Sequence, residues 1–155
     1  MEQYESLLDD AAGRGLTVYE NMNFQSSADG LISGRRIGIS RRMTTYRQRA
    51  CVLAEEIAHA DISTGNILDL RDARARKQEL QAHMAAYDRL IGLVGIVRCY
   101  EAGCRSLYEM ADLLDVTEEF LKEALEAYRM RYGSGASVDC YQILFEPMLS
   151  VIKMI

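Results

Sequence analysis

Two glutamate–histidine pairs at helical spacing are the residues of this sequence that could do chemistry. Glu55 precedes His59 by four residues, and Glu79 precedes His83 by four residues. Residues four apart lie on one face of a helix, so each pair can present a carboxylate and an imidazole together. The chain has only these two histidines. Their matching placement predicts a metal site where two helices meet.

The segment around His59 has the spacing of a zinc-peptidase helix. In H-E-x-x-H, two ligands lie one turn apart, and the glutamate after the first ligand takes a proton from water. Glu55 stands in the first ligand position here, and a carboxylate is an acceptable zinc ligand. Glu56 then has the position of the general base. Glu79, on the next predicted helix, is the candidate third ligand.

Each of these patterns also has a plain structural interpretation. E-E-x-x-H occurs often on helices by chance, and a solvated charged face is its commoner meaning. His83 lies one turn past Glu79 and could serve as a further ligand. An isolated histidine on a polar helix flank is nevertheless more often structural than functional.

The elements that must position these residues begin with a short helix and a small sheet. Apolar spacing predicts a helix over 4–12, and a β-branched and aromatic run predicts a strand over 16–20. Two short runs joined by a tight turn predict a hairpin over 30–39. The main helix is predicted over 46–62, because Thr45 and Gln48 have the spacing of a capping box.

The rest of the chain is predicted to be mainly helical. Helix stop signals at Gly65-Asn66 and a connection over 67–72 precede a long helix over 73–102. Capping residues Ser106 and Thr117 open two further helices, and a late strand is predicted over 138–145, followed by an apolar tail that docks on the body. The core stripe expected on the long helix is Leu80, Met84, Tyr87, Ile91 and Val94.

Length and composition bound the class of protein. A chain of 155 residues predicts one domain, which we divide into a core over 1–102 and a helical packing module with a C-terminal strand and tail over 103–155. The fold class expected is α+β and mostly helical, with a small N-terminal sheet followed by a helical bundle. The net charge of −5 offers no general attraction to nucleic acid or anionic membranes.

Targeting signals and cysteine usage favour a cytoplasmic protein. The acidic start predicts that there is no signal peptide. The longest apolar run, over 90–97, is far shorter than the roughly 20 residues of a membrane span. Four cysteines form no C-x-x-C pair, which predicts free thiols in a reducing compartment.

Two stretches could indicate nucleic-acid binding. Six arginines and no acidic residue lie between Gly30 and Ala54. They could contact nucleic acid or steer an acidic substrate, but we favour a solvated hairpin and helix start. Residues 107–128 have the rhythm of a helix-turn-helix. Its second helix carries four glutamates against Lys122 alone, which would repel phosphates, so we expect a packing module.

The motifs also resemble a known family. Leu53-Ala54-Glu55-Glu56-Ile57-Ala58-His59 resembles the active-site helix of the ImmA/IrrE family of metallo-endopeptidases, and Thr64-Gly65-Asn66-Ile67 after it fits. The stretch over 76–91 resembles the family's second helix, in which a glutamate three residues before an alanine supplies the third ligand. Residues 117–133 and 145–147 are similar to the branch encoded on phages and integrative elements.

This resemblance implies a zincin-like fold and a zinc-dependent endopeptidase that cleaves the element's own repressor, a helix-turn-helix protein. It implies Glu56 as the general base and Zn²⁺ bound by Glu55, His59 and Glu79. In zincin-like folds an edge strand holds the peptide extended, and the strand over 36–40 is expected in that role.

Two departures from the family pattern keep other functions open. Glu55 stands where the peptidase motif has histidine, and Ala58-His59-Ala60 stands where the branch often reads Gly-His-His. A metal-poor pseudo-peptidase that regulates a repressor by binding alone is therefore the alternative. A helix-turn-helix DNA-binding regulator is a third, disfavoured by its acidic helix.

Overall fold

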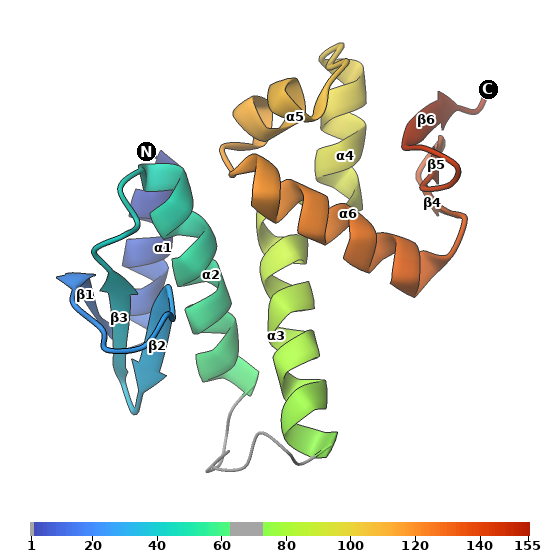
Figure 1. The fold of residues 1–155 in the computed structure, drawn as a ribbon. Coiled ribbons are helices and arrows are strands. Elements are labelled where there is room, and N and C mark those ends of the chain that lie inside the picture. Colours follow the sequence, from blue (N-terminus) through green and yellow to red (C-terminus); the bar gives the residue numbers. More distant parts are fainter. Residues whose placement is uncertain (1, 63–72) are drawn as a thin grey trace. The chain divides into compact units, whose positions relative to one another are not determined.

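The computed structural model describes residues 2–62 and 73–155. Helices and two small sheets together give the chain an α+β structure, as predicted (Figure 1). The chain divides into two compact units, Met1–Ala86 and Tyr87–Ile155. The prediction of one domain with an inner boundary at residue 102 stays a prediction. The predicted helix stop at Gly65-Asn66 and the connection after it lie outside the described residues.

The first unit packs α1 (Glu2–Gly13) and α2 (Tyr46–Ile62) with a three-stranded sheet (Figure 1). Its strands are β1 (Thr17–Met22), β2 (Gly30–Ser33) and β3 (Arg36–Ser40). β2 and β3 form the predicted antiparallel hairpin. The buried apolar side chains that join α1, β3 and α2 include Tyr4, Leu7, Ala11, Ile37, Ile39, Leu53, Ala54 and Ile57.

The expectation that the strand over 36–40 lies at the sheet edge is wrong. The strand order is β1-β3-β2, so β3 is central and β2 is an edge strand. β1 pairs with β3 in parallel on the side away from β2. A hairpin can be recognised from local turn signals, but the pairing of a third strand depends on long-range packing.

The helix α2 begins where the sequence predicts, and its described part runs to Ile62. The Gln48 backbone N–H donates to Thr45 Oγ1 at 3.1 Å, and the Gln48 side-chain oxygen accepts from the Thr45 N–H at 3.1 Å. This is the predicted capping box, and it satisfies two backbone donors at the start of the helix. Leu53 and Ile57 are buried one turn apart, which fixes the face that α2 turns toward the core.

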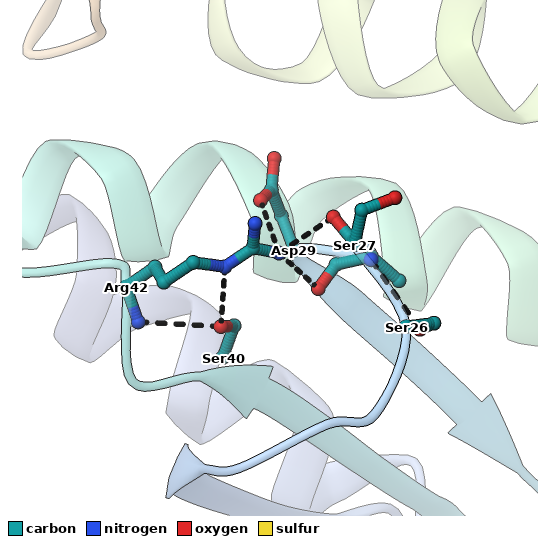
Figure 2. Close-up of polar contacts among 6 residues, drawn as sticks. Ser26, Ser27, Asp29, Ser40 and Arg42 are labelled. Carbon is teal, nitrogen blue, oxygen red and sulfur yellow. Dashed lines mark hydrogen bonds and ion pairs between the residues drawn. The ribbon is translucent and has the colours of Figure 1, made fainter.

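Arg42 fixes the loop that leads into β2. Its guanidinium donates to the carbonyl oxygens of Ser27 at 2.5 Å and Ala28 at 2.8 Å, and its Nε donates to Ser40 Oγ at 3.2 Å. Figure 2 shows the extended Arg42 side chain among these groups and the carboxylate of Asp29, which lies 3.3 Å away. The start of β2 is therefore tied to the end of β3.

Two further arginines of the basic stretch also bind backbone carbonyls. Arg35 donates to the carbonyl of Arg14 at 3.2 Å. Arg49 donates to the carbonyl of Met43 at 3.1 Å and lies over the ring of Tyr46. Together with Arg42, these contacts give half of the six arginines a role within the first unit, which favours the solvated hairpin over a nucleic-acid surface.

The second unit contains α4 (Gly92–Glu101), α5 (Leu107–Leu114), α6 (Glu118–Tyr132) and a second sheet. The predicted caps are present, because Ser106 Oγ accepts from the Glu109 N–H and Thr117 Oγ1 accepts from the Phe120 N–H, both at 3.1 Å. The buried apolar residues of this unit include Ile96, Cys99, Met110, Leu114, Val116, Phe120, Leu121, Tyr128 and Ile143.

The second sheet is an antiparallel meander in the order β4-β5-β6. Its strands are β4 (Gly135–Val138), β5 (Tyr141–Leu144) and β6 (Ser150–Lys153). The late strand predicted over 138–145 corresponds to β5, and Asp139, which has a positive φ of 50°, turns the chain back from β4. The apolar tail pairs with β5 through its backbone, but most of its large apolar side chains are exposed, so the predicted docking is only partly confirmed.

The prediction of one long helix over 73–102 is wrong, because the chain forms two helices there, α3 (Ala73–Leu90) and α4. Gly92 has a φ of 65°, which ends the right-handed helix. Its N–H donates to the hydroxyl of Tyr128 at 3.2 Å rather than continuing the helical ladder. A glycine inside an apolar periodic run gives only a weak break signal, and a side chain from a distant helix completes the break here.

The expected core stripe of the long helix is only partly buried. Tyr87 and Ile91 are buried, whereas Leu80 is 71% exposed and Val94 is 61% exposed. The break separates Val94 from the stripe. The buried side chains of α3 are mostly small ones, at Ala75, Ala82 and Ala86, followed by Tyr87 and Leu90. Among residues 2–62 and 73–155, no helix combines the length and apolar character needed to cross a membrane.

Candidate metal centre

The four predicted metal-site residues form one connected cluster between α2 and α3. His59 Nε2 lies 3.5 Å from Glu79 Oε1, and His83 Nε2 lies 3.2 Å from the same oxygen. His83 Nδ1 lies 3.3 Å from Glu55 Oε1. All four residues belong to the first unit. Two helical pairs that are 24 residues apart in the sequence therefore meet at their carboxylate and imidazole groups, as the matching spacing predicts.

His83 lies between two carboxylates. The hydrogen bond to Glu55 raises the pKa of His83 to about 9, and the charges of Glu55 and Glu79 outweigh the opposing effect of burial. An imidazole with that pKa is protonated near neutral pH, and both ring nitrogens then donate, which matches a carboxylate at each. In the metal-free protein, His83 is thus a cation between two anions.

The donor chemistry of this cluster suits zinc. Two ligand atoms in a tetrahedral zinc site, with bonds of about 2.0–2.1 Å, lie roughly 3.3 Å apart. His59 Nε2 and Glu79 Oε1, at 3.5 Å, are near that spacing. Glu55 joins the cluster through His83, and within the described residues no three donors are already grouped as a metal site. Binding by Glu55, His59 and Glu79 therefore requires Glu55 to exchange its contact with His83 for the metal.

Glu56 is the buried carboxylate of the cluster. It is 9% exposed. Burial raises the pKa of Glu56 to about 7, with further contributions from the charges of Glu55 and Glu79 and an opposing one from His83. A carboxylate whose pKa lies near the operating pH can both accept and return a proton, which is the property required of a general base.

Gly30, at the start of β2, lies directly against Glu56. A β-carbon added at Gly30 would lie 3.1 Å from both Cγ and Oε1 of Glu56, and 2.5 Å from Cγ1 of Val52. The backbone of an edge strand thus passes beside the buried carboxylate. Sequence reasoning missed this role of Gly30. The only local signal was a glycine within a strand, which often marks a close approach of another group.

Replacement of Gly30 by alanine tests the close approach of β2 to α2. We expect Gly30→Ala to lower the free energy of unfolding by about 1–3 kcal/mol, because the new methyl group overlaps Val52 and crowds Glu56. Urea unfolding followed by circular dichroism measures the change. Gly13→Ala is the matched control, because a β-carbon at Gly13 meets nothing within 4 Å. An equal effect of the two variants would contradict the packing described.

The metal-free protein is expected to lose stability as the pH rises. The pKa of Glu56 is raised from 4.5 to about 7, so the folded chain keeps a proton that the unfolded chain releases between these values. Its stability falls over that range, by on the order of 2 kcal/mol. The pKa of His83, raised from 6.5 to about 9, adds stability below pH 6.5 that is lost toward pH 9.

Urea unfolding in the presence of a chelator, between pH 5 and pH 8, measures this dependence. Glu56→Gln carries no titrating group at this position, so its stability relative to the wild type should increase toward pH 8. The control is Glu119→Gln, because Glu119 is exposed. The shift at Glu56 is refuted if the difference between Glu56→Gln and the wild type stays constant across this range.

Comparisons with known proteins do not assign the chain to a family. No protein-family model matches the chain, and neither the curated proteins nor the solved structures give a match. The resemblance to the ImmA/IrrE family therefore stays a prediction from the motifs.

Proposed function

We propose that this protein is a zinc-dependent endopeptidase that cleaves a repressor protein of a phage or integrative element. The observation that carries the proposal is the position of Glu56, a buried carboxylate with a raised pKa, beside a cluster of imidazole and carboxylate donors. One group can accept a proton while its neighbours hold a cation. The motif resemblance to the ImmA/IrrE family gives the class of substrate.

The proposed fold is zincin-like, with β2 as the strand that binds the substrate. β2 is an edge strand, and its first residue lies against Glu56. An extended peptide that adds to a sheet edge is held by backbone hydrogen bonds, with its side chains alternating on the two sides. A substrate on β2 would bring a peptide bond close to Glu56. Arg42 supports this arrangement by fixing the loop that begins the strand.

The residues proposed to hold zinc are Glu55, His59 and Glu79. When bound, zinc supplies Lewis-acid polarisation of a carbonyl and lowers the pKa of water. His83 would then move from Glu55 toward solvent or remain with Glu79 as a partner of the ligand. Such outer partners orient ligands and adjust their basicity.

Glu56 carries the proton steps of the proposed reaction. In its ionised form, Glu56 accepts a proton from the water that attacks the peptide carbonyl. The protonated carboxyl then donates this proton to the amine nitrogen as the peptide bond breaks. Because its pKa is about 7, both transfers are accessible near neutral pH. Gly30 lies against the carboxylate, which is largely buried from solvent.

A pseudo-peptidase is the second candidate function, and His83 favours it. Its imidazolium pairs with both Glu55 and Glu79 and offsets part of their negative charge. A cluster that is complete in this form could serve as a rigid surface that binds a repressor without cutting it.

Zinc content and chelator sensitivity distinguish the two functions. The protein is purified without chelator and its zinc is measured per chain. It is then incubated with the candidate repressor, with and without chelator, and products are identified by mass spectrometry. About one zinc per chain and a cut that the chelator prevents are expected for the peptidase. Zinc-free protein that binds the intact repressor would reject it in favour of the pseudo-peptidase.

A further inference from the structure

Cys99 and Cys104 meet at the C-terminal end of α4. The N–H of Cys104 donates to the carbonyl of Cys99 at 3.0 Å, a bond that closes the last turn of the helix. Gly103 has a φ of 81°, which allows the chain to reverse here. The hydrogen bond between the two backbones holds Cys99 and Cys104 next to each other, and a disulfide requires such proximity.

The side chain of Cys104 also lies close enough to affect the pKa of the Cys99 thiol. Cys99 is buried, whereas Cys104 is half-buried. The Cys99 thiol lies 4.0 Å from the carbonyl of Met110. Burial raises the pKa of Cys99 to about 11, and the hydrogen-bonded thiol of Cys104 contributes to the shift. Cys99 is therefore the protected thiol of the pair, and Cys104 is the accessible one.

A pocket gives small molecules access to this pair. Its volume is about 640 Å³, and both cysteines line it together with Met110 and Leu107. This is within the size range of small-molecule sites. The basic side chains of Arg105 and Lys122 also line it. Glu126 and Arg129 line it as well and pair with each other, so Arg105 and Lys122 leave the lining with a net positive charge. A small anionic disulfide such as oxidised glutathione suits this charge.

We propose that Cys99 and Cys104 form a reversible redox pair that a small disulfide of the glutathione type converts to an intramolecular disulfide. The site lies in the second unit and does not depend on the proposed peptidase function. It is a site of covalent modification in a chain whose other two cysteines, Cys51 and Cys140, lie elsewhere in the sequence.

The reaction proceeds by two thiol–disulfide exchanges. The thiolate of Cys104 attacks one sulfur of the small disulfide, forms a mixed disulfide and releases one small thiol. The thiolate of Cys99 then attacks the sulfur of Cys104, forms the protein disulfide and releases the second small thiol. Each of the two protein thiols loses one proton and one electron, and the small disulfide gains them as it is reduced to two thiols. Excess small thiol reverses both steps.

The test uses full-length protein with Cys140→Ser, which removes the exposed thiol. The protein is incubated with oxidised glutathione, alkylated and digested with trypsin. Cleavage after Arg98 and Arg105 gives a peptide over 99–105 that contains both cysteines. We expect this peptide to lose the mass of two hydrogen atoms, to carry no alkyl group and no glutathione, and to regain both thiols after reduction.

Two variants resolve the order of the steps. Cys99→Ser should retain glutathione on Cys104, because no second thiol can displace it. Cys104→Ser should resist modification, because Cys99 is buried. Circular dichroism checks that each variant folds. Two results would overturn the proposal. One is glutathione that persists on Cys104 in the Cys140→Ser protein, which keeps both Cys99 and Cys104. The other is a disulfide that forms as readily in the urea-unfolded chain as in the folded one.

Discussion

Replacement of Glu56 by glutamine is expected to lower repressor cleavage by about 100-fold or more, the usual scale for a positioned acid–base group. Glutamine keeps the shape of the side chain but cannot accept the proton of the attacking water. Zinc content should not change, because Glu56 is not among the proposed ligands. Intact and cleaved repressor are compared after co-expression with each variant, and zinc is measured on the purified protein.

Glu55→Gln is the control for this experiment. It makes the same chemical change one residue earlier, at a proposed ligand, so zinc affinity should fall first and cleavage should fall with it. The pseudo-peptidase makes a different forecast. The enzyme hypothesis is rejected if Glu56→Gln relieves repression as fully as the wild type does and no cleavage product forms with either protein.

Replacing the two histidines is expected to have different effects on zinc binding. His59→Ala should weaken zinc binding by about 100-fold or more. Loss of an outer partner of a metal site lowers affinity by up to about 100-fold, and loss of a direct ligand should cost at least as much. His83→Ala should preserve zinc affinity or raise it several-fold, because it removes the cation that competes for Glu55 and Glu79. Competition with a chromophoric zinc chelator measures both affinities.

The opposite ranking would assign His83 as the zinc ligand. A large loss of affinity in His83→Ala with little change in His59→Ala would remove His59 from the proposed set. Glu79→Ala is the shared reference, because Glu79 Oε1 contacts both imidazoles. It should lower zinc affinity whichever histidine binds.

The residues of the candidate site and their spacing could be read from the sequence. A four-residue interval places Glu55 with His59 and Glu79 with His83 on any regular helix, and the capping box at Thr45 fixes where the first helix begins. The hairpin and the caps of α5 and α6 were predictable for the same reason. Each depends on hydrogen bonds between residues that are close in the chain.

Other features depended on contacts between residues that are far apart in the chain. The break at Gly92 is completed by the hydroxyl of Tyr128, 36 residues away. The edge position of β2 follows from where β1 pairs, and the raised pKa of Glu56 follows from its burial beside Gly30 and the charges of α3. Local spacing therefore determined which groups could act together. Tertiary packing decided that His83 lies between two carboxylates and that Glu56 is desolvated, because burial and charge depend on every element packed around a group.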